Sequence, residues 1–213
     1  MQDAIERTEE YVKQNMKEYK DATHDWFHIE RVWKTAKKIA QEEGADMFIV
    51  EMAALLHDID DFKFNENGTT LKSKSWLESL GLDSDTIDKI VHIVENISFK
   101  GSAEENKIQT LEGKVVQDAD RLDAIGAFGV ACAFTYAGYK NIPIFNPAVE
   151  IRNNMSFDEY KKNEGSAINH FHEKLLLLKD RMNTKAGKFL AEDRHNFMET
   201  YLKQFFKEAN GES

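Results

Sequence analysis

The sequence predicts an all-α protein, and two observations carry that prediction. Apolar residues recur at intervals of three and four over most of the chain, which is the period of an amphipathic helix. Helix-breaking residues are scarce, with 2 prolines and 11 glycines among 213 residues. Hydrophobic residues make up 41% and charged residues 31%, a mixture typical of a globular helical chain that excludes a disordered or collagen-like protein.

The first helices are predicted from apolar stripes and from residues that begin or end helices. Residues 5–19 place apolar side chains on one face. The second helix begins near Asp25, a common capping residue, and Gly44 ends it. The apolar run Phe48–Leu56 predicts a third helix that is buried all round and closes at His57.

Later helices are predicted at residues 72–80, 84–97 and 114–125, and in a tail that runs to about residue 209. A capping-box spacing at Ser156 and Glu159 precedes that tail. Both prolines fall in residues 138–150, where no helical pattern exists, so we expect a surface loop or lid there.

Charge and hydropathy narrow the function classes. The formal net charge is −10, and the sequence has no long run of Lys or Arg. Long nucleic acid is therefore an unsuitable partner, whereas a small phosphorylated molecule remains a suitable one. No apolar run approaches the roughly 20 residues of a spanning helix. The acidic, amphipathic start does not resemble a signal peptide, and we expect a cytoplasmic protein that does not enter a membrane.

Several histidines and aspartates lie where the predicted helices begin and end. His57 and Asp58 close the buried run, and His28 lies in the first turn of its helix. Asp118 and Asp120 lie within a later apolar helix. Buried ionisable groups are costly unless something compensates them, and two imidazoles with two carboxylates form a suitable site for a divalent cation. The alternative for each residue alone is an ordinary hydrogen-bonded group at a helix end.

The order of these residues resembles the H…HD…D signature of the HD superfamily of metal-dependent phosphohydrolases. The segments around His28, around His57 and at His170–Lys174 are similar to those of small bacterial stand-alone members. The likeness extends from about residue 20 to 200. It implies an all-α helical bundle with a central metal site. We expect a single domain over residues 1–213, with the metal-site core at about 20–130 and a helical C-terminal part at about 150–209.

The resemblance implies that His28, His57, Asp58 and Asp120 hold one divalent metal ion. Asp118 stays open as the competitor of Asp120 for the fourth position. One metal is expected because relatives with two usually carry extra histidines between the third ligand and the last, where this chain has only His92. Nitrogen and oxygen ligands suit Mn²⁺, and Fe²⁺, Co²⁺, Ni²⁺, Zn²⁺ and Mg²⁺ are alternatives.

The resemblance also implies roles around the metal. Asp61, three residues beyond Asp58, is the candidate catalytic proton acceptor, and a solvated carboxylate at a helix end is its alternative. Lys63, His92, His170 and Lys174 are candidate substrate-binding residues, and exposed or core-edge positions are their alternatives.

The implied function is hydrolysis of a phosphorylated small molecule, in particular cleavage of a nucleoside triphosphate to monophosphate and pyrophosphate. A 5′-nucleotidase or a cyclic-nucleotide phosphodiesterase would use the same ligands. A non-catalytic nucleotide sensor of the same fold is the rival class. Monomer and homodimer are both open.

Overall fold

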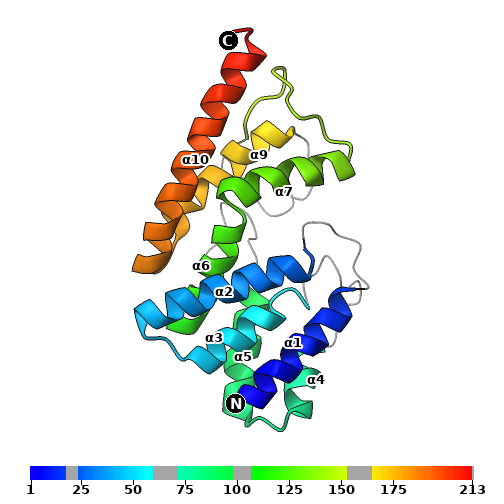
Figure 1. The fold of residues 1–213 in the computed structure, drawn as a ribbon, viewed down its shortest axis with the longest axis vertical. Coiled ribbons are helices and arrows are strands. Elements are labelled where there is room, and N and C mark those ends of the chain that lie inside the picture. The colour runs from blue at the N-terminus through cyan, green and yellow to red at the C-terminus, as the bar shows by residue number, and fades with distance from the viewer. Residues whose placement is uncertain (18–23, 60–71, 98–106, 153–164, 213) are drawn as a thin grey trace. The chain divides into compact units, whose positions relative to one another are not determined.

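The structure is a computed structural model, and it describes residues 1–17, 24–59, 72–97, 107–152 and 165–212. Within these ranges every regular element is a helix and no strand occurs, which confirms the predicted all-α class (Figure 1). The chain divides into two compact units within one helix: described residues up to Asp120 belong to the first unit, and those from Arg121 to the second. The single domain expected over residues 1–213 stays a prediction.

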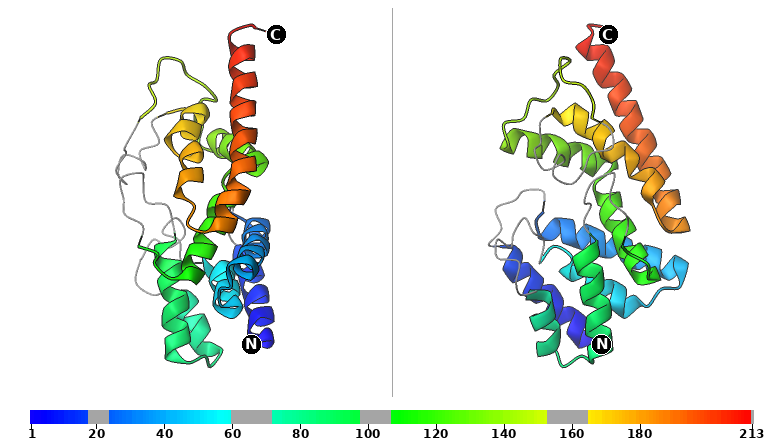
Figure 2. Two further views of the ribbon diagram at one scale, coloured as in Figure 1. Left: turned by 90° about the vertical axis from the view of Figure 1, so that its left-hand side faces the viewer. Right: turned by 180° about the vertical axis from the view of Figure 1, so that it is seen from behind.

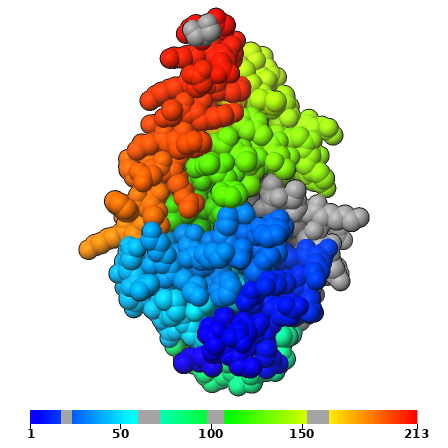
Figure 3. Space-filling view, in the orientation of Figure 1, coloured from blue at the N-terminus to red at the C-terminus, as the bar shows by residue number. Residues whose placement is uncertain are grey.

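The first unit is built around α3. Its elements are α1 (Gln2–Met16), α2 (Trp26–Glu43), α3 (Met47–Leu56), α4 (Lys72–Ser79), α5 (Ser84–Asn96) and α6 (Leu111–Asp123) as far as Asp120. α3 packs against α1, α2 and α5, and every residue from Ile49 to Ile59 is buried. In the space-filling view, α1 and α2 make up most of the visible face of this unit (Figure 3). The polar residues at the end of α3 are therefore inside the protein.

Local capping sets the ends of α2 and α3. The Asp25 carboxylate accepts a hydrogen bond from the His28 backbone N–H at 3.0 Å, which confirms the predicted cap. Gly44 ends α2 with a φ of 73°, a left-handed conformation that favours glycine. Asp46 then caps α3 by accepting from the N–H groups of Phe48 and Ile49. The two helices consequently form a hairpin with a tight turn.

The second unit has an aromatic core. Its elements are α7 (Gly126–Tyr139), α9 (Ala167–Glu173), the short 3₁₀ turns η1 (Leu175–Leu177) and η2 (Lys179–Arg181), and α10 (Lys185–Ala209). α7 contacts both α9 and α10 (Figure 2). Phe171 on α9 is fully buried, and its ring stacks on Tyr201 of α10 at 5.9 Å between centroids. The end of α10 at Ala209 agrees with the predicted end of the tail.

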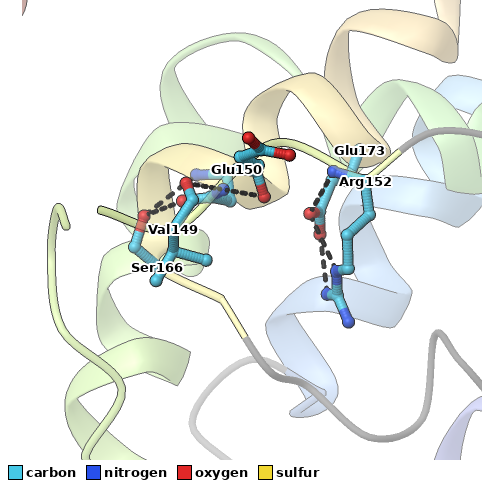
Figure 4. A network of polar contacts seen from close by, with 6 residues as sticks. Val149, Glu150, Arg152, Ser166 and Glu173 are labelled. Carbon is cyan, nitrogen blue, oxygen red and sulfur yellow. Dashed lines mark hydrogen bonds and ion pairs between the residues drawn. The ribbon is translucent and has the colours of Figure 1, made fainter. Parts of the chain in front are cut away.

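The segment before residue 152, expected as a loop or lid, is held against α9. The first N–H groups of α9, at Ala167 and Ile168, donate to the carbonyls of Pro143 and Ile144 at 3.0 and 3.1 Å. The Asn169 amide donates to two further carbonyls of the segment, and Arg152 forms a two-pronged ion pair with Glu173 (Figure 4). The segment is non-helical from residue 140, whereas Gly138 and Tyr139, which were expected in the loop, belong to the end of α7. It is anchored at several points. The predicted capping box at Ser156 and Glu159 lies outside the described residues.

Among the described helices, none is by itself long and apolar enough to cross a membrane. α6 and α7 meet the length and composition criteria only when they are taken together as a bent pair.

Candidate metal centre

Four side chains from three helices of the first unit converge on one point. His28 comes from the first turn of α2, His57 and Asp58 from the end of α3, and Asp120 from α6. The two Nε2 atoms are 3.3 Å apart. Oδ1 of Asp120 lies 3.6 Å from Nε2 of His28 and 3.8 Å from Nε2 of His57. The Asp58 carboxylate lies 3.5 Å from each of the same two nitrogens. His28, His57 and Asp120 offer ligand atoms that all lie within 4.8 Å of one another.

Burial differs among the four residues. The side chains of His28, His57 and Asp58 are 8%, 2% and 8% exposed, whereas that of Asp120 is 29% exposed. Desolvation penalises ionised groups, so a buried carboxylate favours surroundings that supply positive charge or hydrogen bonds. The cluster therefore has a dry side formed by α2 and α3, and the Asp120 side is the more open to solvent.

A hydrogen bond fixes the tautomer of His57. Its Nδ1 lies 2.8 Å from the backbone carbonyl of Ala54, and a carbonyl can only accept. Nδ1 of His57 therefore carries a proton, so in the neutral ring Nε2 presents its lone pair to the cluster, as a metal-ligating imidazole must. The His28 ring also packs against the His24 ring in an edge-to-face arrangement, with 5.6 Å between centroids.

These residues fit a divalent metal ion. Ligand atoms about 2.1 Å from a common ion stand roughly 3.0–3.5 Å apart, and the observed separations of 3.3–3.8 Å are close to that. The mixed set of imidazole nitrogen and carboxylate oxygen suits Mn²⁺, Fe²⁺ and their neighbours in the first transition row. The site can thus hold a cation with little movement of the described side chains.

Comparison with known proteins places the chain in a family. The HD domain family model matches residues 26–125. The chain is 41% identical over 191 residues to the uncharacterized protein YpgQ of Bacillus subtilis, a match that covers 88% of this chain and 85% of the relative. This chain belongs to the HD superfamily.

Similarity to solved structures supports the assignment of this chain to the HD superfamily. A protein from Lactobacillus plantarum is 34% identical with a TM-score of 0.88, covering 99% of this chain and 98% of that one. A protein from Bacillus thuringiensis described as an HD-superfamily hydrolase is 41% identical with a TM-score of 0.77, covering 98% of both chains. The structure of YpgQ in complex with ADP has a TM-score of 0.77 at 36% identity and covers 98% of this chain and 100% of that one.

Helical geometry distinguishes between Asp118 and Asp120, the two candidate aspartates of α6. Residues two apart on an α-helix point in directions about 200° apart, so Asp118 and Asp120 cannot face the same cluster. Asp118 is fully buried, whereas the Asp120 carboxylate lies within 4 Å of both imidazoles. The assignment of Asp120 as a ligand stays a proposal, and this geometry favours it.

The remaining predicted site residues fall in three places. Asp61 and Lys63 lie outside the described residues. His92 is exposed on α5, where its carbonyl accepts from the Asn96 amide at 2.8 Å. His170 and Lys174 belong to α9 and its cap in the second unit. Burial, and to a smaller extent the positive charge of Lys174, lower the pKa of His170 from 6.5 to about 3, so this imidazole is neutral at physiological pH.

One buried polar group on the helices of the metal centre was not predicted from the sequence. Glu51 lies in the middle of α3 and is 7% exposed. Its Oε2 accepts from Nε1 of Trp33 at 2.9 Å and lies 3.1 Å from Nζ of Lys37. The available signal was a single charged residue inside an otherwise apolar run.

Proposed function

We propose that this HD protein is a metal-dependent phosphohydrolase that acts on nucleotides. The observation that carries the proposal is the buried convergence of two imidazoles and two carboxylates in the first unit. The HD-superfamily hydrolase from Bacillus thuringiensis and the ADP complex of YpgQ support the reaction class and the ligand class. The specific reaction we propose is cleavage of a nucleoside triphosphate to monophosphate and pyrophosphate.

In this proposal His28, His57, Asp58 and Asp120 hold one divalent ion, Mn²⁺ being our first choice. When bound, such an ion polarises a phosphoryl oxygen and lowers the pKa of a coordinated water. The Ala54 carbonyl keeps the His57 ring in the tautomer that can bind the ion. Because Asp120 is the most exposed of the four, the substrate is proposed to reach the centre from its side.

Other residues of the chain have proposed roles in proton transfer and binding. Asp61 accepts the proton of the attacking water, and we expect Asp61→Asn to lower kcat about a hundredfold while leaving metal content unchanged. Lys63 and Lys174 supply positive charge to phosphate oxygens. His170, being neutral, contributes a hydrogen bond and no charge. His92, on the exposed side of α5, completes the proposed set.

The test is hydrolysis of a nucleotide panel by the full chain with Mn²⁺, with parallel samples containing a chelator. The panel contains nucleoside triphosphates, diphosphates, monophosphates and cyclic monophosphates, and both phosphate and pyrophosphate release are measured. Pyrophosphate released only from triphosphates, and only without chelator, is the expected result. Phosphate from monophosphates would indicate a nucleotidase, and ring opening a phosphodiesterase. Nucleotide binding without any product would identify a sensor and overturn the proposed activity.

A further inference from the structure

Glu51 is a charged residue at an otherwise apolar helix interface. α2 and α3 form the most extensive contact between any two described elements, and α3 is apolar apart from Glu51. The Glu51 side chain is 10% exposed, and its Oε2 atom receives both the Trp33 indole N–H and the Lys37 ammonium. Lys37 also lies over the Trp33 ring, at 5.0 Å from its centroid. One oxygen of α3 is thus clamped by two residues of α2.

The clamp lies between the turn of the hairpin and the metal centre. Trp33 follows His28 by five residues on α2, and Glu51 precedes His57 by six residues on α3. At 1.5 Å per residue, the clamp is roughly 8–9 Å from the centre along both helices. The turn at Gly44 closes one end of the hairpin, and the two histidines meet at the other.

Apolar packing alone specifies the offset of two helices weakly. The free energy of apolar burial depends on area and has no direction, whereas a hydrogen bond and an ion pair to the same oxygen are satisfied at one offset only. The Lys37 side chain is 46% exposed, and ion pairs open to solvent contribute little to stability, so stability is a poor reason for keeping this one. Fixing a register is the best attested use of such groups.

We propose that Glu51 is a positioning residue that sets the register of α2 against α3 and thereby the spacing of His28 and His57. This inference rests on the proposed metal site. A slip of one residue moves one helix by about 1.5 Å, whereas metal–ligand distances tolerate about 0.2 Å. A register error too small to unfold the hairpin is therefore large enough to spoil the site.

The experiment compares Glu51→Leu with Ile39→Val, a fully buried position of α2 outside the clamp. Three quantities are measured on each variant: the Kd for Mn²⁺ by calorimetry, the urea midpoint of the metal-free protein, and the nuclear Overhauser effect between the His28 and His57 rings. The two ring centroids are 5.3 Å apart in the structure, so a ring-to-ring effect is expected for the wild type.

For Glu51→Leu we expect a Kd weakened about tenfold or more, a lowered urea midpoint because the Trp33 indole N–H loses its acceptor, and a lost ring-to-ring effect. Ile39→Val should lower the midpoint and leave the other two unchanged. Glu51→Gln, which can still accept from Trp33, should recover part of the metal affinity. The proposal is overturned if Glu51→Leu keeps wild-type affinity and ring contact, or if it loses stability with both unchanged.

Failure of the metal proposal would look different. A wild type that binds no Mn²⁺ refutes the proposed site, and the ring-to-ring effect in the metal-free variants then still decides whether Glu51 sets the register.

Discussion

Asp58 in the first unit and Glu173 in the second are equally buried, at 5% exposure each, but they have different neighbours. Glu173 receives the guanidinium of Arg152 through two hydrogen bonds of 3.0 and 2.9 Å, and the Arg152 backbone N–H as well (Figure 4). Asp58 lies beside the imidazoles of His28 and His57. In the second unit a buried carboxylate forms an ion pair with an arginine of the chain, whereas in the first unit a buried carboxylate lies among imidazole nitrogens that can bind a metal ion. Equal burial therefore accompanies two different chemistries.

The largest difference between the two units is expected for a substitution of His57, because it should abolish metal binding. His57→Ala removes an imidazole whose tautomer is already set for binding, and we expect bound Mn²⁺ to fall from about one per chain to almost none. Hydrolysis should fall together with metal content. Elemental analysis and a turnover assay measure the two losses. His92→Ala, at an exposed position of the same unit, is the control and should keep its metal. A fully loaded His57→Ala protein would remove His57 from the site.

The two aspartates of α6 give a sharper version of the same test. Asp120→Asn should weaken Mn²⁺ binding by roughly a hundredfold, because its carboxylate lies within 4 Å of both imidazoles. Asp118→Asn should keep most of the metal, since a residue two positions away faces another direction. Calorimetric titration of both variants measures the difference. The reverse result would exchange the two roles.

The sequence predicted the helices of the first unit closely, because the determinants are local. Asp25 and Gly44 act on their own turns, and the apolar run before His57 needs no distant partner to be recognised. The residue types at the helix ends suggested that His28, His57 and Asp120 converge on a cation, but ordinary helix-end groups stayed an alternative, since helical spacing says nothing of which helices meet; the resemblance then favoured the metal site. The register contact of Glu51 with Trp33 depends on tertiary packing between residues 18 apart.

The segment at residues 141–152 shows why its anchoring escaped prediction. Pro143 and Pro147 indicate correctly that no helix forms there, and a surface loop or lid was the natural expectation. The bonds that hold the segment are mainly backbone carbonyls accepting from α9, and carbonyls are present at every residue. The charges of Arg152 and Glu173 could have indicated their ion pair. However, the two residues are 21 positions apart, and the chain contains many other pairs of opposite charge at such separations.

For Glu173 in the second unit, we expect a substitution to lower the stability of the protein without changing its metal binding. Glu173→Gln keeps the shape of the side chain and removes its charge, leaving Arg152 partly buried without its carboxylate. Breaking a fully buried pair costs about 3–5 kcal/mol, and we expect about 2–3 kcal/mol because 28% of the Arg152 side chain is exposed.

Urea denaturation measures that loss, and calorimetry should show an unchanged Kd for Mn²⁺. The matched control is Glu192→Gln, which removes an exposed carboxylate 3.4 Å from Lys179 and should cost less than about 1 kcal/mol. A change in metal affinity equal to that of Asp120→Asn would mean that the two buried carboxylates are not independent.

The smallest expected effect concerns His170, the neutral histidine of the second unit. Its pKa is lowered from 6.5 to about 3, by burial first and by Lys174 second. Between these values the unfolded chain binds a proton that the folded chain does not, so the free energy of unfolding falls as the pH drops below 6.5. Above pH 6.5 the folded protein therefore has the full stabilising contribution of neutral His170. Between pH 7.5 and 5 we expect His170 to account for about 1–2 kcal/mol of lost stability.

His170→Asn should flatten the stability profile across that interval, while His92→Asn, at an exposed position, controls for the loss of a histidine. Urea midpoints at successive pH values give the profile, and nuclear magnetic resonance of the ring protons gives the pKa directly. A profile for His170→Asn as steep as wild type, with a ring that titrates near pH 6.5, would mean that the imidazole is hydrated. His170 would then be protonated below about pH 6.5, and its proposed role as a neutral hydrogen-bonding residue would be wrong.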